Sequence, residues 1–300
     1  MANPIVTSLP AYVEEKKIGL IRNAVIGAKS ASLFNLQTGI KGATAINLLN
    51  TDVVFGDGSD CGWDDAGTST LSQRKLTPGY PKVNMSFCDK VLLKTYANYL
   101  VKIAAGQKTM PFEEDFIAGV IENVKAKLET MIWTGSVSGG DAFDGIETVI
   151  TGTSFVPVTY TSGATVTSIV NSTYAAIPSA AFNKGQVVMF MGSDMYRAYI
   201  QELIANGNLV ITTGLNDVAM PDSILIPGTN VRVYGVAGLD GTGDVYASYQ
   251  DNFIYGTDLQ GDDEKFDFWY SQDNREFRLA IEMAIGVQVA FPDMLVKASL

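Results

Sequence analysis

Clusters of acidic residues are the best candidates in this sequence for a metal-binding or catalytic site. Four aspartates fall within the segment GDGSDCGWDD, and Ca²⁺ is the ion that several carboxylate oxygens would bind together. Their spacing lacks the alternating ligands and the terminal glutamate of an EF-hand, so it favours a solvated loop tip, as it does for residues 262–264. The four residues are Asp57, Asp60, Asp64 and Asp65.

A second acidic group, Glu113, Glu114 and Asp115, has the residue types of a glycosidase acid–base pair. Adjacent positions of a helix point in different directions, and all three side chains suit a first helical turn, where the macrodipole stabilises anions. The pattern therefore favours a structural role. A hydrolase that uses carboxylates stays open on composition alone.

Histidine is absent from the 300 residues, which excludes a Ser-His-Asp triad, a Cys-His dyad and every zinc site that includes histidine. Two cysteines, Cys61 and Cys88, are too few for a four-cysteine zinc site and indicate a reducing compartment. A straight β-hairpin, at about 3.3 Å per residue, would hold them tens of ångströms apart. We predict free thiols, with a bridge between subunits as the alternative.

Three short motifs fail on inspection. The glycines of GDGSDCG miss the dinucleotide-binding spacing, and GAKS at 27–30 lacks the glycine that precedes the lysine of a Walker A motif. The segment GSVSG at 135–139 has valine where a nucleophile elbow has serine. We predict no catalytic residue, no cofactor and no metal site.

Composition points to a globular protein with protein partners. Apolar residues make up 47% of the chain and charged residues 18%, which leaves much of the surface uncharged. The net charge of −11 argues against a protein that grips nucleic acid by its phosphates. We see neither a signal peptide nor an apolar run long enough to span a membrane.

The stretch from Thr109 to Gly135 has the clearest secondary-structure pattern in the chain, and we expect the other elements to pack around it. Its apolar residues recur at steps of three and four, Pro111 suits a first turn, and Gly135 suits a helix end. We predict a helix over 111–133, about 35 Å long at 1.5 Å per residue. A helix of this length is unusual in a compact domain.

Four further segments have recognisable patterns. We predict an N-terminal arm with a short helix at 1–41, a long β-finger at 42–88 and a helix at 92–105. Apolar residues at every odd position of 277–291 predict one long strand with one buried face, in which Arg278, Glu282 and Gln288 point outward.

The region between these elements predicts a mixed α+β lobe. Residues 155–167 read as a strand and 168–177 as a helix. Residues 185–208 predict a buried strand followed by a helix, with Ser193 as N-cap and Gly207 as its end. Three strand-like pieces follow, SILIPG, VRVYGV and DVYASY. We place this lobe at 155–239 and leave 89–154 and 240–300 to a second unit.

The order of these elements resembles the major capsid proteins of tailed bacteriophages, which have the Hong Kong 97-type α+β fold. PFEEDFIAGVIENVKAKLETMIWTG followed by FDGIETVI is similar to the family's spine helix and the segment after it. YAAIPSAAF and QVVMFMGSDMYRAYIQELIANG are similar to its axial domain. The resemblance covers nearly the whole chain.

The resemblance implies an N-terminal arm, an E-loop at 42–88, a peripheral domain with the spine helix, and an axial domain at 155–239. It implies a structural protein that assembles through hexamers and pentamers into an icosahedral shell around double-stranded DNA, first in the host cytoplasm and then as part of the virion. Scaffolding, portal and decoration or head-completion proteins are the implied partners. An acidic chain suits a container that should not bind its genome tightly. The arm begins almost at Met1, so we expect a separate scaffold or prior cleavage.

The resemblance also implies that the E-loop lies on a neighbouring subunit. The residues expected at this contact are Asp57, Cys61, Trp63, Arg74, Lys75 and Lys82. Some family members cross-link a finger lysine to an asparagine, for which Lys75 and Lys82 are the candidates by location, although nothing local marks either as activated. An encapsulin-like nanocompartment shell, which shares the fold, is the alternative function.

Overall fold

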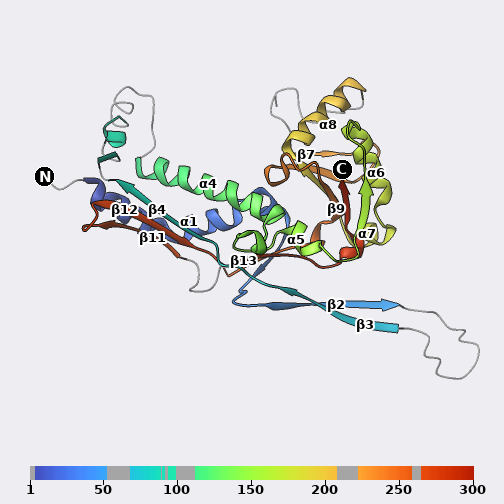
Figure 1. The fold of residues 1–300 in the computed structure, drawn as a ribbon, viewed down its shortest axis with the longest axis horizontal. Helices are drawn as coiled ribbons and strands as arrows, with labels where there is room; N and C mark the ends of the chain where they lie inside the picture. The colour runs from blue at the N-terminus through green and yellow to red at the C-terminus, as the bar shows by residue number, and fades with distance from the viewer. Residues whose placement is uncertain are drawn as a thin grey trace, which may run out of the picture.

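The computed structural model describes residues 4–52, 68–88, 90–91, 94–98, 112–207, 222–258 and 265–300. Figure 1 shows two long helices beside a sheet at one end, a second lobe of sheet and helices at the other, and a hairpin that projects from the underside. The hydrophobic core beneath the two long helices continues into the junction between the two lobes. The molecule is therefore elongated, as the long helix predicted.

Helix α4 (Phe112–Thr134) confirms the predicted long helix to within one residue at each end. Its acidic residues 113–115 occupy the first turn, as expected. One face is buried along its whole length, because apolar residues recur at helical spacing. The residues of this face are Ile117, Val120, Ile121, Val124, Leu128 and Ile132.

The N-terminal segment is more than an arm with a short helix. Helix α1 (Pro4–Ile26) has 23 residues, and α2 (Lys29–Leu33) and strand β1 (Asn35–Thr38) follow it. Leu9 and Val13 are fully buried in the same core as α4, and α1 packs against both α4 and the sheet. The prediction was wrong because a weakly amphipathic sequence gains its helical stability from tertiary packing.

A three-stranded antiparallel sheet lies against the two long helices, in the order β11-β12-β4. Its inner face carries the apolar half of the alternation, and ring contacts such as Phe87 with Phe116 of α4, 5.0 Å between centroids, tie the sheet to the helix. The helical residues at 94–98 fall within the predicted helix 92–105, of which 92–93 and 99–105 lie outside the described residues. The strands are β4 (Lys82–Cys88), β11 (Lys265–Ser271) and β12 (Glu276–Glu282).

The predicted long C-terminal strand is two strands in different sheets. β12 ends at Glu282, and β13 (Ile285–Val289) pairs with β10 (Phe253–Thr257), which in turn pairs with β1. Pro81 lies opposite the break and has no N–H to give to a ladder. The alternation of side chains continues through the break, so the pattern could not reveal it.

The second lobe is built on a six-stranded sheet in the order β5-β14-β9-β6-β8-β7. Strand β9 is the predicted piece DVYASY, which extends beyond the predicted boundary at residue 239, and β14 was assigned to the other unit; both complete this sheet. Helices α6, α7 and α8 accompany it in Figure 1. The strands are β5 (Val156–Thr159), β6 (Val187–Gly192), β7 (Ser223–Leu225), β8 (Arg232–Val236), β9 (Val245–Tyr249) and β14 (Val296–Ser299).

Side chains that are distant in sequence cap the starts of α6 and α8, and Thr165 adds a local cap to α6. The predicted unit of strand and helix is confirmed, but Ser193 is the first residue of α8 and not its cap; Asp240 accepts the Ser193 N–H. Glu202 of α8 accepts the N–H groups of Val166 and Thr167 at 3.0 and 2.7 Å. Burial opposes its ionisation, but these bonds outweigh burial and lower the pKa of Glu202. The helices are α6 (Val166–Ala176), α7 (Ser179–Lys184) and α8 (Ser193–Ala205).

The last turns of α4 join the two lobes. Trp133 is fully buried, and its ring lies within 6.2 Å of four other aromatic rings, centroid to centroid. Its indole N–H donates to the Ser30 hydroxyl at 2.7 Å, and Ser30 donates its hydroxyl and its N–H to the buried Glu129 carboxylate. The four rings belong to Phe34, Phe190, Tyr246 and Phe253.

We expect Glu129→Gln to flatten the pH dependence of stability. Burial raises the pKa of Glu129 above the ordinary 4.5, against the hydrogen bonds from Ser30. Because the pKa is higher in the folded state, this carboxyl contributes stability below pH 4.5 that is lost as the pH rises through the folded-state pKa. Urea unfolding of the soluble subunit between about pH 4 and pH 8 measures the slope. Glu122→Gln, on the exposed side of α4, is the control, and an equal slope in wild type and Glu129→Gln would contradict the prediction.

Candidate assembly surfaces

The projecting hairpin consists of β2 (Thr44–Asp52) and β3 (Thr68–Leu76), paired antiparallel from Thr44 opposite Leu76 to Asp52 opposite Thr68. In the view of Figure 1 it leaves the underside of the body and runs below the second lobe. The predicted finger was too long on its C-terminal side, because β4 pairs with β12 in the body and not with β2. A two-stranded ribbon is marginally stable alone, so its packing at the root and any contact beyond the chain matter most.

The root of the hairpin fits into a notch in the body. Leu76 is fully buried with Ile40 and Ile254, and it lies over Gly256 of β10. A Cβ at Gly256 would come within 2.4 Å of a Leu76 methyl carbon and 2.5 Å of one of Ile40. A side chain at this point of β10 would have to push the terminal methyl groups of Leu76 and Ile40 aside, so glycine allows the hairpin root to pack closely.

The structure describes three of the six predicted contact residues. Asp57, Cys61 and Trp63 lie outside the described residues. Lys75 is exposed on the hairpin. Arg74 is half-buried and turns toward its own body, and Lys82 lies on β4, where it faces Glu282 at 3.7 Å.

Cys88 is free within this single chain, and the alternative of a bridge between subunits stays a prediction. It is exposed at the end of β4 and makes no disulfide. Cys61 lies outside the described residues.

An open apolar groove of about 460 Å³ lies between β4 and α4. Strand β4 pairs with β12 on one side, and no strand of the described residues pairs with its other edge. Met85 is 40% exposed in the groove, and Lys82, Lys127 and Asp141 lie among its polar lining. An edge strand beside an apolar groove is a form of surface that takes extended peptide.

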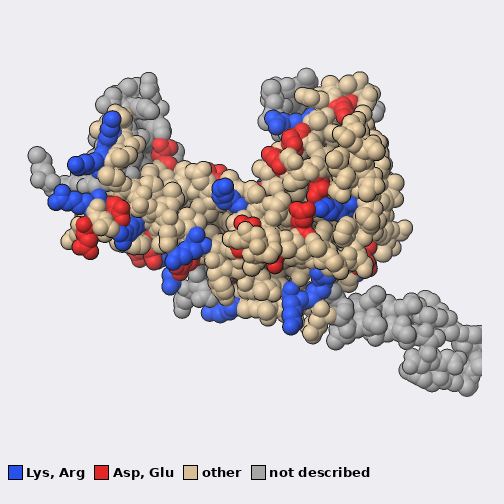
Figure 2. All heavy atoms as spheres, viewed as in Figure 1, with Lys and Arg blue, Asp and Glu red and all other residues tan. Residues whose placement is uncertain are grey.

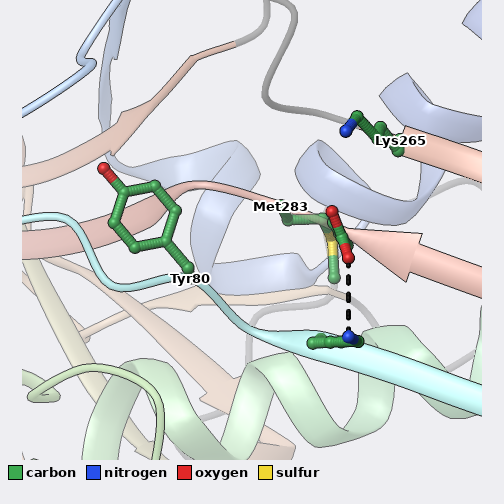
Figure 3. Close-up of a pocket in the computed structure, with 5 residues that line it drawn as sticks. Tyr80, Lys265 and Met283 are labelled. Atoms are coloured by element: carbon green, nitrogen blue, oxygen red, sulfur yellow. Dashed lines mark ion pairs between the residues drawn. The ribbon is translucent and has the colours of Figure 1, made fainter.

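A second hollow, of about 410 Å³, lies where the hairpin base meets the sheet (Figure 3). Tyr80 and Lys265 stand on opposite sides of Met283, and the drawn ion pair joins Lys82 to Glu282. These side chains offer no nucleophile with a base in reach, so the hollow can bind but has no evident means of catalysis.

Charge is dispersed on the face that Figure 2 shows, with acidic and basic side chains separated by wide uncharged areas. Among the described residues, no group of three or more acidic, cysteine or histidine side chains could hold a metal ion. Within those same ranges, no helix is both long and apolar enough to cross a membrane.

No family model and no curated protein matches the sequence. Solved structures do match. The capsid of a native GTA particle is similar with a TM-score of 0.59 and 10% identity over 92% of this chain and 90% of that one. Gordonia phage Cozz gives 0.58 and 13%, over 92% and 86%. A virus-like particle from Pyrococcus furiosus gives 0.55 and 10%, over 95% and 98%.

The chain has the Hong Kong 97-type fold of tailed-phage major capsid proteins. This confirms the fold that the sequence pattern indicated. At such low identity the shared feature is architecture, because different apolar residues can satisfy the same pattern of burial. The sequence missed Gln288, which was predicted to point outward; it is buried beside the hairpin root because all of β13 is covered on both faces.

We expect Gly256→Ala to lift the hairpin root of this capsid fold from its notch. The new methyl group would overlap Leu76 and Ile40 and should cost about 1–3 kcal/mol in the free energy of unfolding. Chemical denaturation and hydrogen exchange of the Leu76 region measure it. Gly185→Ala, where a Cβ meets open space, is the matched control; equal effects of the two would exclude the notch.

Proposed function

We propose that this chain is the major subunit of a viral capsid. It assembles through hexamers and pentamers into an icosahedral shell that encloses double-stranded DNA, in the host cytoplasm and then in the virion. The observation that carries the proposal is the likeness to capsid and phage structures over 92% of the chain.

The parts of the fold have separate roles in this proposal. The unit of α1, α4 and the sheet β11-β12-β4 is the peripheral domain, and the six-stranded sheet with its helices is the axial domain at the centre of each ring. The hairpin is the E-loop. Scaffolding, portal and decoration or head-completion proteins are its proposed partners, and a net charge of −11 suits a wall that does not hold DNA tightly.

The groove between β4 and α4 is the proposed receptor for the hairpin end of a neighbouring copy. Residues 53–67, which join β2 to β3, contain Val, Phe and Trp side chains together with four aspartates. The groove offers apolar walls with Lys82 and Lys127 among its polar lining. Apolar contact favours this pairing, whereas the charges of the groove are mixed, because Asp141 also lines it and Lys82 lies 3.7 Å from Glu282.

We expect the replacement of residues 53–67 by Asn-Gly to abolish particles while the subunit still folds. Asp52 and Thr68 are paired in register, so a two-residue turn can join them without disturbing β2 or β3. Thermal unfolding should be unchanged, and light scattering with negative-stain microscopy should find no closed shells. Closed particles from this variant would disprove the role of the hairpin end.

We expect Met85→Glu to reduce assembly, since it places a carboxylate in the groove that receives aspartates. Asn84→Glu adds the same charge at the next, exposed position of β4 and is the matched control. Assembly rates from light scattering should fall about tenfold for Met85→Glu, or about 1.4 kcal/mol, and stay near wild type for Asn84→Glu. Equal rates for both variants would place the contact elsewhere.

A nanocompartment shell is the second candidate function. It is favoured by the match to the Pyrococcus furiosus virus-like particle, of which 98% is covered. Purified particles distinguish the two: nuclease-protected DNA supports the viral capsid, whereas a co-purified enzyme and no DNA supports the compartment.

A further inference from the structure

Two side chains from distant parts of the chain meet where the hairpin leaves the body. Gln288 of β13 is 7% exposed, and its amide oxygen accepts a hydrogen bond from the Arg74 guanidinium at 3.1 Å. Its amide nitrogen donates to the carbonyl oxygen of Lys75 at 2.7 Å. One glutamine therefore holds the side chain and the main chain of consecutive β3 residues.

The chemistry of this contact is unusual for its surroundings. Both neighbours of Gln288 along β13 are buried valines, and polar groups are costly to bury unless they are bonded. Arg74 donates to Val149 O at a longer 3.5 Å, and among the described residues its buried Nε has no partner. Burial lowers the pKa of the Arg74 guanidinium from its ordinary value. A pair of apolar side chains could be buried here at a lower cost in free energy, but apolar contacts do not fix an orientation as hydrogen bonds do.

Two further contacts restrain the same end of β3. Leu76 occupies the Gly256 notch, and Gly79 exchanges two main-chain hydrogen bonds with Ile285 at 2.8 and 3.0 Å. Gln288 thus holds β3 a residue or two before the notch, while Gly79 holds the chain just beyond it. A hairpin held at these points cannot tilt without breaking a bond.

We propose that Gln288 is a positioning residue that fixes the direction in which the hairpin leaves the body. Each hairpin strand spans about 30 Å at 3.3 Å per residue, so a tilt of about 10° at the root displaces its far end by about 5 Å. Such a displacement exceeds the tolerance of a packed interface. Given the proposed function, on which this step rests, Gln288 also determines how uniformly copies join.

The test compares Gln288→Leu with Gln250→Leu. Gln250 is also a partly buried glutamine that donates to a carbonyl, that of Leu33 at 2.9 Å, but it lies away from the hairpin. Spin labels are attached at Asn47→Cys on β2 and Lys127→Cys on α4, in a chain that also carries Cys61→Ser and Cys88→Ser. Double electron–electron resonance of the unassembled subunit then measures the distance between the two labels, which reports the direction of the hairpin. We expect the distance distribution to broaden about twofold in Gln288→Leu and to stay narrow in Gln250→Leu.

Particles provide the second readout, since unlabelled Gln288→Leu should give a broader range of diameters by microscopy than Gln250→Leu. An unchanged label distribution, or equal broadening in both variants, overturns the proposal. If the wild type forms no particles, the proposed function fails, but the label distances still decide the role of Gln288. Should Gln288→Leu not fold, Arg74→Met removes one of the two contacts of Gln288 and must also broaden the distance distribution, whereas an unchanged distribution overturns the proposal.

Discussion

The fold depends on the burial of Trp133 at the end of the long helix. Its indole is covered on several sides by rings from Phe34, at the end of α2, and from β6, β9 and β10, and its one polar atom is satisfied by Ser30. A tryptophan of this size is stable inside a protein only when its N–H finds a partner. Because these rings come from both lobes, the same side chain fixes the helix, the N-terminal segment and the second sheet.

A group of oppositely charged side chains also lies in this part of the molecule. Lys297 of β14 lies 3.1 Å from Glu147 of α5 (Ile146–Ile150) and 2.9 Å from Asp244, and it is close to the Tyr246 ring. Burial, together with Asp244, raises the pKa of Tyr246 and keeps it neutral. The Lys297–Asp244 pair is largely buried, with side chains 14% and 11% exposed, so breaking it would be costly because it leaves a charge without a partner; Glu147 is 44% exposed and contributes less.

The hairpin differs from this junction, because only its root is packed in the body. Its root is fixed by a notch, a main-chain pair and the Gln288 contact, while its strands extend away from the core that stabilises the rest of the chain. Stability in the body and a long projection from it are the combination that a tiling subunit needs. In the proposed shell, the interior of the subunit would hold the direction of the hairpin, and contact between copies would supply the remaining stability.

The sequence alone determined the elements that have their own periodicity and end signals. Helix α4, the β6–α8 unit and the hairpin strands follow from apolar spacing, glycine and proline, which act over a few residues, and their order pointed to the capsid fold. Tertiary structure decided the rest. The break opposite Pro81, the capping of α8 by Asp240 and the burial of Gln288 each depend on a partner more than 40 residues away. Local patterns do not reveal such partners, because the same residue types are compatible with solvent and with the core. Only the folded chain determines which of the two surrounds them.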